Sequence, residues 1–340
     1  MNQNSLPFKV FEGSSLLTVP EDASEPIIED ILFKNDIVML VAEDKQGKTI
    51  MATQMACSLT VGKPFLDVFD IPEPVNVWYF AHEGKEGSII DRLIRTGNHT
   101  GYNEDRLKVF SAPKLRWNDD HCKEGFDYLL EQYKEDLPKV IIIDPLYAAM
   151  AGDLNSNVSM GDFIHNVRCF AGECGASVIL IHHMKKSQRD DKGNYYKRSD
   201  GDAYGSALMK WAVDHVFWID TYRYAKGEEA PQDNKDRDRW FKCDTQRGGN
   251  IVNGLRLKLN HDDPLYFSIV DKHIHEHHKV MALLRSNPEG MNVAELIKRS
   301  RIARASMYII LRELQEIRSV EKYGEKTKYY KATLRELGLK

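Results

Sequence analysis

Short apolar runs alternate with longer stretches of helical periodicity between residues 37 and 270. The short runs predict strands, whereas apolar positions three and four residues apart predict helices. Because the short runs are apolar throughout, the strands are expected to be buried on both faces, as in a parallel sheet. The pattern therefore predicts an α/β fold with a mainly parallel twisted sheet flanked by helices. Strands are expected at 37–41, 75–80, 107–111, 140–143, 177–181, 215–219, 240–244, 254–259 and 266–270, and helices at 48–60, 88–96, 122–133, 160–174 and 206–212.

Beyond residue 271 the pattern changes to helix, turn, helix, turn, helix and hairpin, which is the layout of a winged helix-turn-helix. The first helix is expected to end at Arg285, the others span 293–299 and 303–317, and the hairpin turns at Gly324. We therefore expect an N-terminal arm at 1–30, a sheet domain at 31–271 and a small winged-helix domain at 272–340. The expected core of the last domain comprises Val280, Leu283, Leu284, Val293, Leu296, Ile297, Ile309, Leu311 and Leu314.

The composition is that of a soluble globular protein, with 42% hydrophobic and 29% charged residues among 340. No uncharged apolar run approaches the roughly 18 residues that span a membrane, and no signal-peptide pattern opens the chain. The five cysteines are scattered and lack CxxC spacing, which argues against disulfides and a zinc site. We therefore expect a cytoplasmic protein without membrane contact.

The charge is unevenly distributed along the chain. Residues 272–340 contain 15 Lys and Arg against 8 Asp and Glu, a net charge of +7, whereas residues 1–271 carry −11. A basic tail on an acidic body favours nucleic-acid binding by the tail, although a merely solvated basic surface gives the same pattern.

Several tail residues are candidates for DNA contact. Arg301, Arg304 and Ser306 lie at the start of the third helix, the end that normally enters the major groove, with Arg299 just before them. The hairpin offers Lys322, Lys326 and Lys328 to phosphates. Winged helices also bind proteins, which is the alternative. The histidines at the opening of the tail are expected to form a solvated linker and not a metal site: His273, His275, His277 and His278.

A candidate phosphate loop runs through Ala42, Glu43, Asp44, Lys45, Gln46, Gly47, Lys48 and Thr49. It follows a predicted strand and precedes a predicted helix, as a Walker A loop requires. Backbone N–H groups and the helix N-terminus attract phosphates, Lys48 adds a full positive charge, and Thr49 can bind Mg²⁺. Ala42 replaces the first glycine of the motif, which weakens the match. A chance Gly-Lys-Thr at a helix start is the alternative.

Polar residues follow three further predicted strands, where open α/β sheets bind ligands. Glu83 could polarise an attacking water, and Asp144 after KVIII fits a Walker B aspartate that holds Mg²⁺. His182 and His183 follow SVILI. Each has a plainer interpretation: a surface carboxylate for Glu83, a turn for Asp144 and ordinary half-buried residues for the histidines. Their joint occurrence in order favours a nucleotide site.

Residues 31–259 resemble the RecA-like P-loop ATPases, and within them the RepA-type hexameric replicative helicases of plasmids (AAA_25-like), with DnaB-type helicases more distant. The resemblance rests on AEDKQGKT, YFAHEG followed by DRL, VIIIDPL, VILIHHMKKS, GDAYGSALMKWAVD and DTQRGGN. It implies that Lys48 and Thr49 bind ATP and Mg²⁺, that Glu83 is the catalytic base, that Asp144 serves the metal, and that His182 or His183 senses the γ-phosphate.

The sequence departs from this family at the arginine finger. Tyr204 stands where relatives often carry the finger, and Thr245 stands where a Lys is expected. We assign the finger to Arg247, with Arg198 and Lys210 as alternatives.

The resemblance also implies a homo-oligomer, hexameric in those relatives, that threads single-stranded DNA through the core. Lys185 and Lys186 would face the pore, and the tail would bind duplex DNA. The function expected is therefore that of an ATP-dependent replicative helicase of a mobile element. The alternative is a DNA-binding regulator or loader that does not unwind DNA and uses ATP as an assembly switch.

Overall fold

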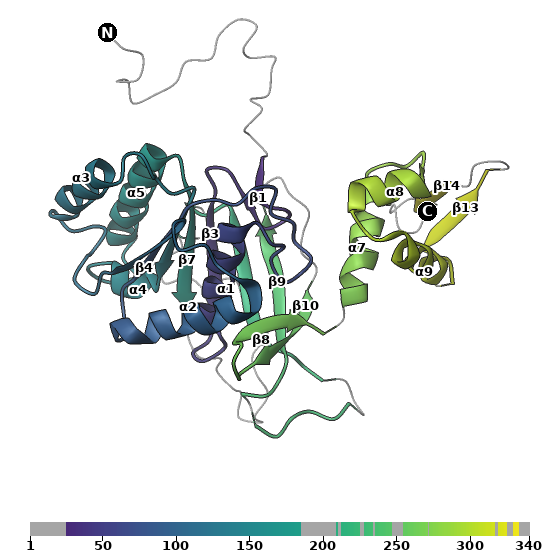
Figure 1. Ribbon diagram of the computed structural model, residues 1–340, viewed down its shortest axis with the longest axis horizontal. Coiled ribbons are helices and arrows are strands. Elements are labelled where there is room, and N and C mark those ends of the chain that lie inside the picture. Colours follow the sequence, from purple (N-terminus) through teal and green to yellow (C-terminus); the bar gives the residue numbers. More distant parts are fainter. Residues whose placement is uncertain are drawn as a thin grey trace, which may run out of the picture.

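The computed structural model describes residues 25–184, 209, 212–224, 228–233, 235–246, 254–270, 272–316, 319–324 and 329–332. Figure 1 shows a large body built on a central sheet and a smaller body formed by the C-terminal helices and hairpin. Within these ranges, the longest helices are too short or too polar to cross a membrane.

The central sheet has nine strands in the order β11-β10-β9-β8-β3-β7-β6-β4-β5. The six strands from β8 to β5 run parallel, and β9, β10 and β11 continue the sheet in antiparallel fashion. The predicted mainly parallel sheet is confirmed. The strands are β3 (Ile37–Ala42), β4 (Val77–Ala81), β5 (Leu107–Ser111), β6 (Val140–Asp144), β7 (Ser177–His183), β8 (His215–Thr221), β9 (Arg239–Gln246), β10 (Leu255–Asn260) and β11 (Tyr266–Ile269).

Helices cover both faces of this sheet, as predicted. On one face, α1 (Lys48–Val61) and α2 (Glu86–Thr100) pack with one hydrophobic cluster, and on the other α3 (Cys122–Gln132), α4 (Leu146–Ala149) and α5 (Asn157–Cys174) pack with a second. A hairpin of β1 (Pro26–Ile28) and β2 (Leu32–Phe33) joins the first cluster, because its isoleucines are buried.

Some boundaries differ from those predicted. Helix α2 extends beyond the expected 88–96 at both ends, and β4 begins at Val77 and not at residue 75. The four-residue helix α4 was not predicted, because one turn is too short to show a period. The helix expected at 206–212 lies mostly outside the described residues.

The tail contains the predicted three helices and hairpin. They are α7 (Lys272–Arg285), α8 (Val293–Ser300), α9 (Arg304–Glu316), β13 (Val320–Tyr323) and β14 (Tyr329–Ala332), with β14 also pairing to β12 (Met291–Asn292). An Asn292–Glu295 capping box starts α8. The expectation of a linker is wrong, since these residues form the first turns of α7; His277 Nε2 lies 2.8 Å from Glu313 Oε2.

Most of the expected tail core is buried or packs against it, but Ile309 is not. Ile309 is 41% exposed, whereas Ile310 is fully buried. The buried positions of α9 are Met307, Ile310, Leu311 and Leu314, a spacing of three, one and three that keeps them on one helical face. Ile309 falls outside that face, so its assignment to the core was wrong.

Candidate active site

The phosphate loop joins the fully buried strand β3 to the N-terminus of α1. Gly47 has φ of +95°, and a Cβ there would lie 2.6 Å from the Phe267 ring, so only glycine fits both the backbone and the space. Ala42 is the last residue of β3 and is extended. It therefore needs none of the freedom of the glycine that it replaces in the motif.

The Lys48 ammonium lies inside this loop. Its Nζ donates to the carbonyl oxygens of Ala42 at 3.1 Å and Glu43 at 2.7 Å, and the side chain is 5% exposed. Burial lowers the pKa of Lys48 to about 8, although the charges of Asp44, Asp144, Glu83 and Glu43 oppose this. A buried cation among carboxylates and loop carbonyls is suited to phosphate groups.

The pleat of the sheet separates the predicted polar residues into two sets. In β4, β6 and β7, alternate side chains belong to the cluster beneath α1 or to the cluster beneath α5. This alternation turns Glu83, Asp144 and His183 toward α1 and the phosphate loop. It turns His82 and His182 toward the opposite layer, and both are at most 3% exposed.

Asp144 and Thr49, the two predicted magnesium ligands, lie together. Asp144 is 7% exposed, and its Oδ2 accepts a hydrogen bond of 2.5 Å from the Tyr79 hydroxyl. Burial raises the pKa of Asp144, while hydrogen bonds from Tyr79 and Thr49 oppose the increase. A hydroxyl and a carboxylate are oxygen ligands of the kind Mg²⁺ takes alongside substrate phosphates. These residues therefore fit a magnesium–nucleotide complex.

Glu83 lies at the exposed rim of this site. Burial of its carboxyl, followed by the charge of Asp144, raises the pKa of Glu83, whereas Lys48 lowers it. The Tyr147 hydroxyl donates a hydrogen bond to Glu83 Oε2. A carboxylate with raised pKa beside the phosphate loop is equipped to accept a proton.

The neighbouring His82 is structural. Its Nε2 accepts a hydrogen bond of 3.1 Å from the Trp117 indole, which packs edge-on against Phe80. Burial lowers the pKa of His82 to about 4, so the ring is neutral at physiological pH. His183 is half-buried, and burial together with the charge of Lys48 lowers its pKa.

Three residues near the site were not predicted from the sequence: Tyr79, Arg92 and Tyr147. Arg92 on α2 lowers the pKa values of Tyr79, Glu83 and Asp144 by its charge. Tyr79 could have been predicted from the alternation of side chains within VWYFA, because Tyr79 lies on the same face of the strand as Glu83. The other two are brought close only by the tertiary fold.

The predicted DNA-contacting residues fall in several places. Arg304 is exposed and Ser306 half-buried at the start of α9. Arg301 is exposed but forms ion pairs with the body, 3.0 Å to Asp70 and 3.6 Å to Glu29. Lys185, Lys186, Arg247, Lys326 and Lys328, together with Arg198, Tyr204 and Lys210, lie outside the described residues.

The described residues contain no cluster of three or more His, Cys, Asp or Glu suited to a metal ion. The five cysteines are free thiols.

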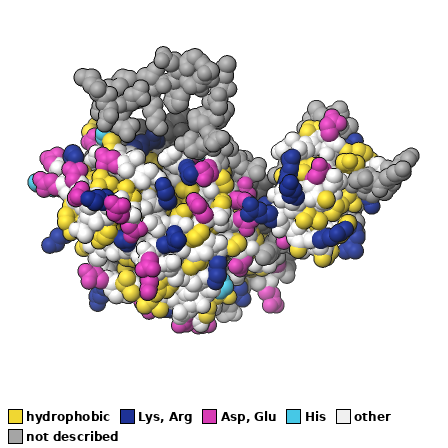
Figure 2. Space-filling view, turned by 45° about the horizontal axis from the view of Figure 1, so that its top comes forward, with side chains coloured by type: hydrophobic (Ala, Val, Ile, Leu, Met, Phe, Trp, Pro, Cys, Tyr) yellow, Lys and Arg dark blue, Asp and Glu magenta, His cyan; other side chains and the backbone are white. Residues whose placement is uncertain are grey.

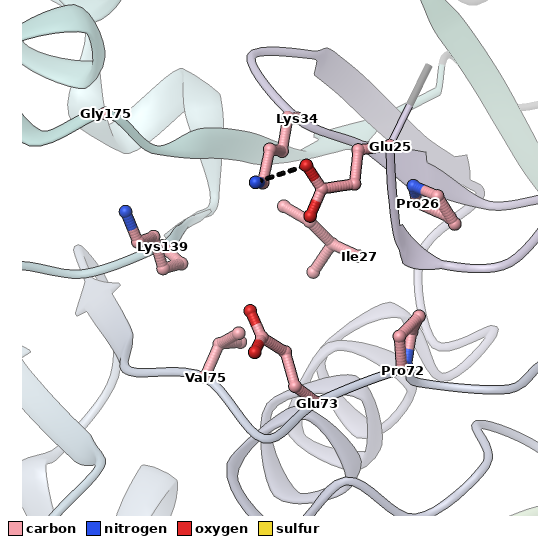
Figure 3. Close-up of a pocket in the computed structure, with 9 residues that line it drawn as sticks. All are labelled: Glu25, Pro26, Ile27, Lys34, Pro72, Glu73, Val75, Lys139 and Gly175. Atoms are coloured by element: carbon pink, nitrogen blue, oxygen red, sulfur yellow. Dashed lines mark hydrogen bonds and ion pairs between the residues drawn. The ribbon is translucent and has the colours of Figure 1, made fainter. Parts of the chain in front are cut away.

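A cavity of about 300 Å³ lies at the amino ends of the strands, opposite the strand ends that carry the phosphate loop. Figure 3 shows Lys34 paired with Glu25, and Glu73 and Lys139 at the rim. These charged residues are remote from the phosphate loop and offer matched controls for it.

Together these positions define a P-loop protein of the α/β class. A family model described as an AAA domain (AAA_25) matches residues 6–189, more than half of the 340 residues. The chain belongs to this family.

Three solved structures resemble the fold. A DnaB-like replicative helicase, described with its interactions with primase, aligns with 16% identity and a TM-score of 0.50 over 69% of this chain and 59% of that one. The chain therefore spans less than two thirds of that helicase, and the likeness shows a RecA-like fold. A second structure, described as an ATPase domain, aligns with 17% identity and a TM-score of 0.48, over 67% and 82% of the two chains. A KaiC-like protein of Pyrococcus horikoshii OT3 aligns with 12% identity and a TM-score of 0.47, over 72% and 93%.

Proposed function

We propose that this protein is a DNA-acting ATPase, specifically a RepA- or DnaB-like replicative helicase of a mobile element that hydrolyses MgATP at the interfaces of a homo-oligomer. One observation carries the proposal. The carboxyl ends of four neighbouring strands place Lys48, Asp144, Glu83 and His183 on one face of the sheet, around the phosphate loop. Four residues of the expected types, in the expected order and on the same face of the sheet, are difficult to obtain without a nucleotide site.

Each residue then has a distinct task. Lys48 and the backbone N–H groups of the loop bind the phosphates, and Thr49 and Asp144 hold Mg²⁺, which neutralises charge on the phosphate oxygens. Glu83 accepts a proton from the attacking water. His183, half-buried beside Lys48, contacts the γ-phosphate. Arg247 of a neighbouring subunit supplies the finger.

The tail is proposed as the duplex-binding part. Figure 2 shows more Lys and Arg than acidic side chains on the visible face of the smaller body. Arg304 is exposed at the N-terminus of α9, in the position that a winged helix-turn-helix presents to DNA. Lys185 and Lys186 are proposed to meet single-stranded DNA in the core.

Steady-state ATP hydrolysis with and without a single-stranded oligonucleotide tests the enzyme. We expect Lys48→Ala to abolish nucleotide binding, and Glu83→Gln to bind ATP but lower kcat at least about a hundredfold, the contribution typical of a general base. Lys139→Ala and Glu73→Gln change the same residue types at the opposite sheet edge and should leave hydrolysis unchanged. Wild-type turnover in Lys48→Ala would refute the proposed site.

Salt-dependent binding to duplex DNA tests the tail. Arg304→Ala should weaken binding and reduce the slope of log K against log salt by about one, as expected for one lost phosphate contact. Lys123→Ala on the distant helix α3 is the control, since that lysine already pairs with Asp127 at 2.9 Å. An unchanged slope in Arg304→Ala would remove this residue from the interface.

The alternative function is a nucleotide-dependent regulator or loader that does not unwind DNA. Tyr204 in place of an arginine finger favours it, because a missing finger slows hydrolysis by orders of magnitude. Gel filtration with and without ATP and DNA separates the two. A ring with DNA-stimulated turnover supports the helicase, whereas a monomer or dimer that binds duplex supports the regulator.

A further inference from the structure

Tyr147 touches two candidate active-site residues that come from different strands. Its hydroxyl donates to Glu83 Oε2, beyond the end of β4. Its ring meets the His183 imidazole of β7 edge-on, with ring centroids 5.3 Å apart and an interplanar angle of 76°. The tyrosine therefore bridges the candidate base and the candidate γ-phosphate sensor.

The short helix α4 makes this bridge possible. It follows directly after Asp144 at the end of β6, the strand that lies between β4 and β7. Leu146 and Ala149 are fully buried and anchor the helix in the core. Tyr147 lies on the other side of the turn and is 42% exposed, so its ring can move without unpacking α4.

The hydrogen bond has a direct chemical consequence for Glu83. A donor to a carboxylate stabilises the charged form and makes the oxygen a weaker proton acceptor. It also occupies one oxygen and fixes the direction of the other. While the Tyr147 contact lasts, Glu83 is therefore held back as a base.

The other contact of Tyr147 leads to the phosphate loop. His183 lies close enough to Lys48 for the lysine charge to lower the pKa of the imidazole. A shift of His183 toward a bound phosphate would displace the tyrosine ring that rests against it. The same displacement would break the hydrogen bond to Glu83.

We propose that Tyr147 is a positioning residue that restrains Glu83 in the ATP-bound protein until DNA binding lets His183 move toward the γ-phosphate, which couples the two ends of the site. This inference rests on the proposed ATPase function, in which Glu83 is the base.

Tyr147→Phe in the full-length protein tests the proposal, because it keeps the ring on His183 and removes only the hydroxyl. We expect kcat without DNA to rise about three- to tenfold, the effect of losing one partly exposed hydrogen bond to a charged group, with KM changed less than about twofold. The rate with a saturating dT oligonucleotide should stay at the wild-type value, so the stimulation ratio falls by the same factor. A merely structural role would instead lower both rates.

Tyr102→Phe is the matched control, since Tyr102 is also 42% exposed but lies after α2, away from the phosphate loop. An unchanged or lower basal kcat in Tyr147→Phe overturns the proposal. Glu83→Gln, measured alongside, separates this failure from that of the proposed function. If wild type hydrolyses ATP and Glu83→Gln does not, only the role of Tyr147 is refuted, whereas full turnover in Glu83→Gln refutes the base itself.

Discussion

Gln54 attaches the edge of the central sheet to helix α1. Its Nε2 donates to the Phe267 carbonyl at 2.9 Å, and its Oε1 accepts from the Phe267 N–H at 2.8 Å. Gln54 is 3% exposed and Phe267 1% exposed, so water cannot replace either bond. One side-chain amide thus satisfies both backbone groups of a residue on the edge strand β11.

Gln54→Met removes both bonds and keeps the length of the side chain. Each buried backbone group left without a partner costs about 1–3 kcal/mol, so we expect the free energy of unfolding to fall by about 2–6 kcal/mol. Phe267 also packs against Gly47, so ATP binding should weaken as β11 loosens. Urea unfolding gives the first quantity, and titration with a fluorescent ATP analogue gives the second.

Asn98→Ala is the control for this experiment. Asn98 also attaches a helix, α2, to the hairpin formed by β10 and β11. It does so by a hydrogen bond of 2.8 Å to Asp263, but this bond is exposed. Its loss should cost less than about 1 kcal/mol. If Gln54→Met costs no more than Asn98→Ala, burial does not determine the strength of this attachment, and the reasoning is refuted.

Three further predictions concern pH and stability. Because the pKa of Lys48 in the free protein is about 8, ATP affinity should be constant below pH 7 and fall by up to about tenfold per unit above pH 8, which calorimetry at pH 7 to 9.5 would detect. The pKa of His82 is lowered to about 4, so its contribution to the free energy of unfolding is greatest above pH 6.5 and decreases by roughly 3 kcal/mol as the pH falls toward 4. Urea melts at several pH values should show a smaller dependence of the free energy of unfolding on pH in His82→Gln. Gly172→Ala should raise the free energy of unfolding by about 0.5–1 kcal/mol, since this helical position has open space for a Cβ and normal φ, and a thermal melt with no gain would contradict this.

The parallel part of the sheet could be predicted because strands such as β3, β4 and β6 are apolar and buried on both faces. Runs such as IVMLV and VIII are typical of strands that are covered on both faces, as in a parallel sheet. The antiparallel direction of β9, β10 and β11 was not predicted, because recognising a segment as a strand does not say whether it pairs with its neighbours in parallel or antiparallel fashion. Which of Ile309 and Ile310 is buried also depends on how α9 rotates against α7 and α8, and helical period alone leaves this open.

The candidate site was predictable as far as its residue types. Lys48 and Thr49 could be identified because Gly-Lys-Thr lies between a strand and a helix, and Asp144 and Glu83 because each lies at or just beyond the end of a strand. The choice between His182 and His183 could not be made, because a pleat of period two says that they face opposite ways but not which way faces α1. Tyr147 could not be found, because its partners are 64 and 36 positions away along the chain.

The division of the strand ends between two faces places a strict limit on strand length. Removing one residue from β4 would bring Glu83 to the place of His82, against Trp117, and Gly84 to the place of Glu83, so the phosphate loop would lose its carboxylate. The same deletion in β7 would bring Met184 to the place of His183 and turn His183 to the opposite face. Each strand can therefore tolerate changes of its apolar side chains more readily than a change in its number of residues.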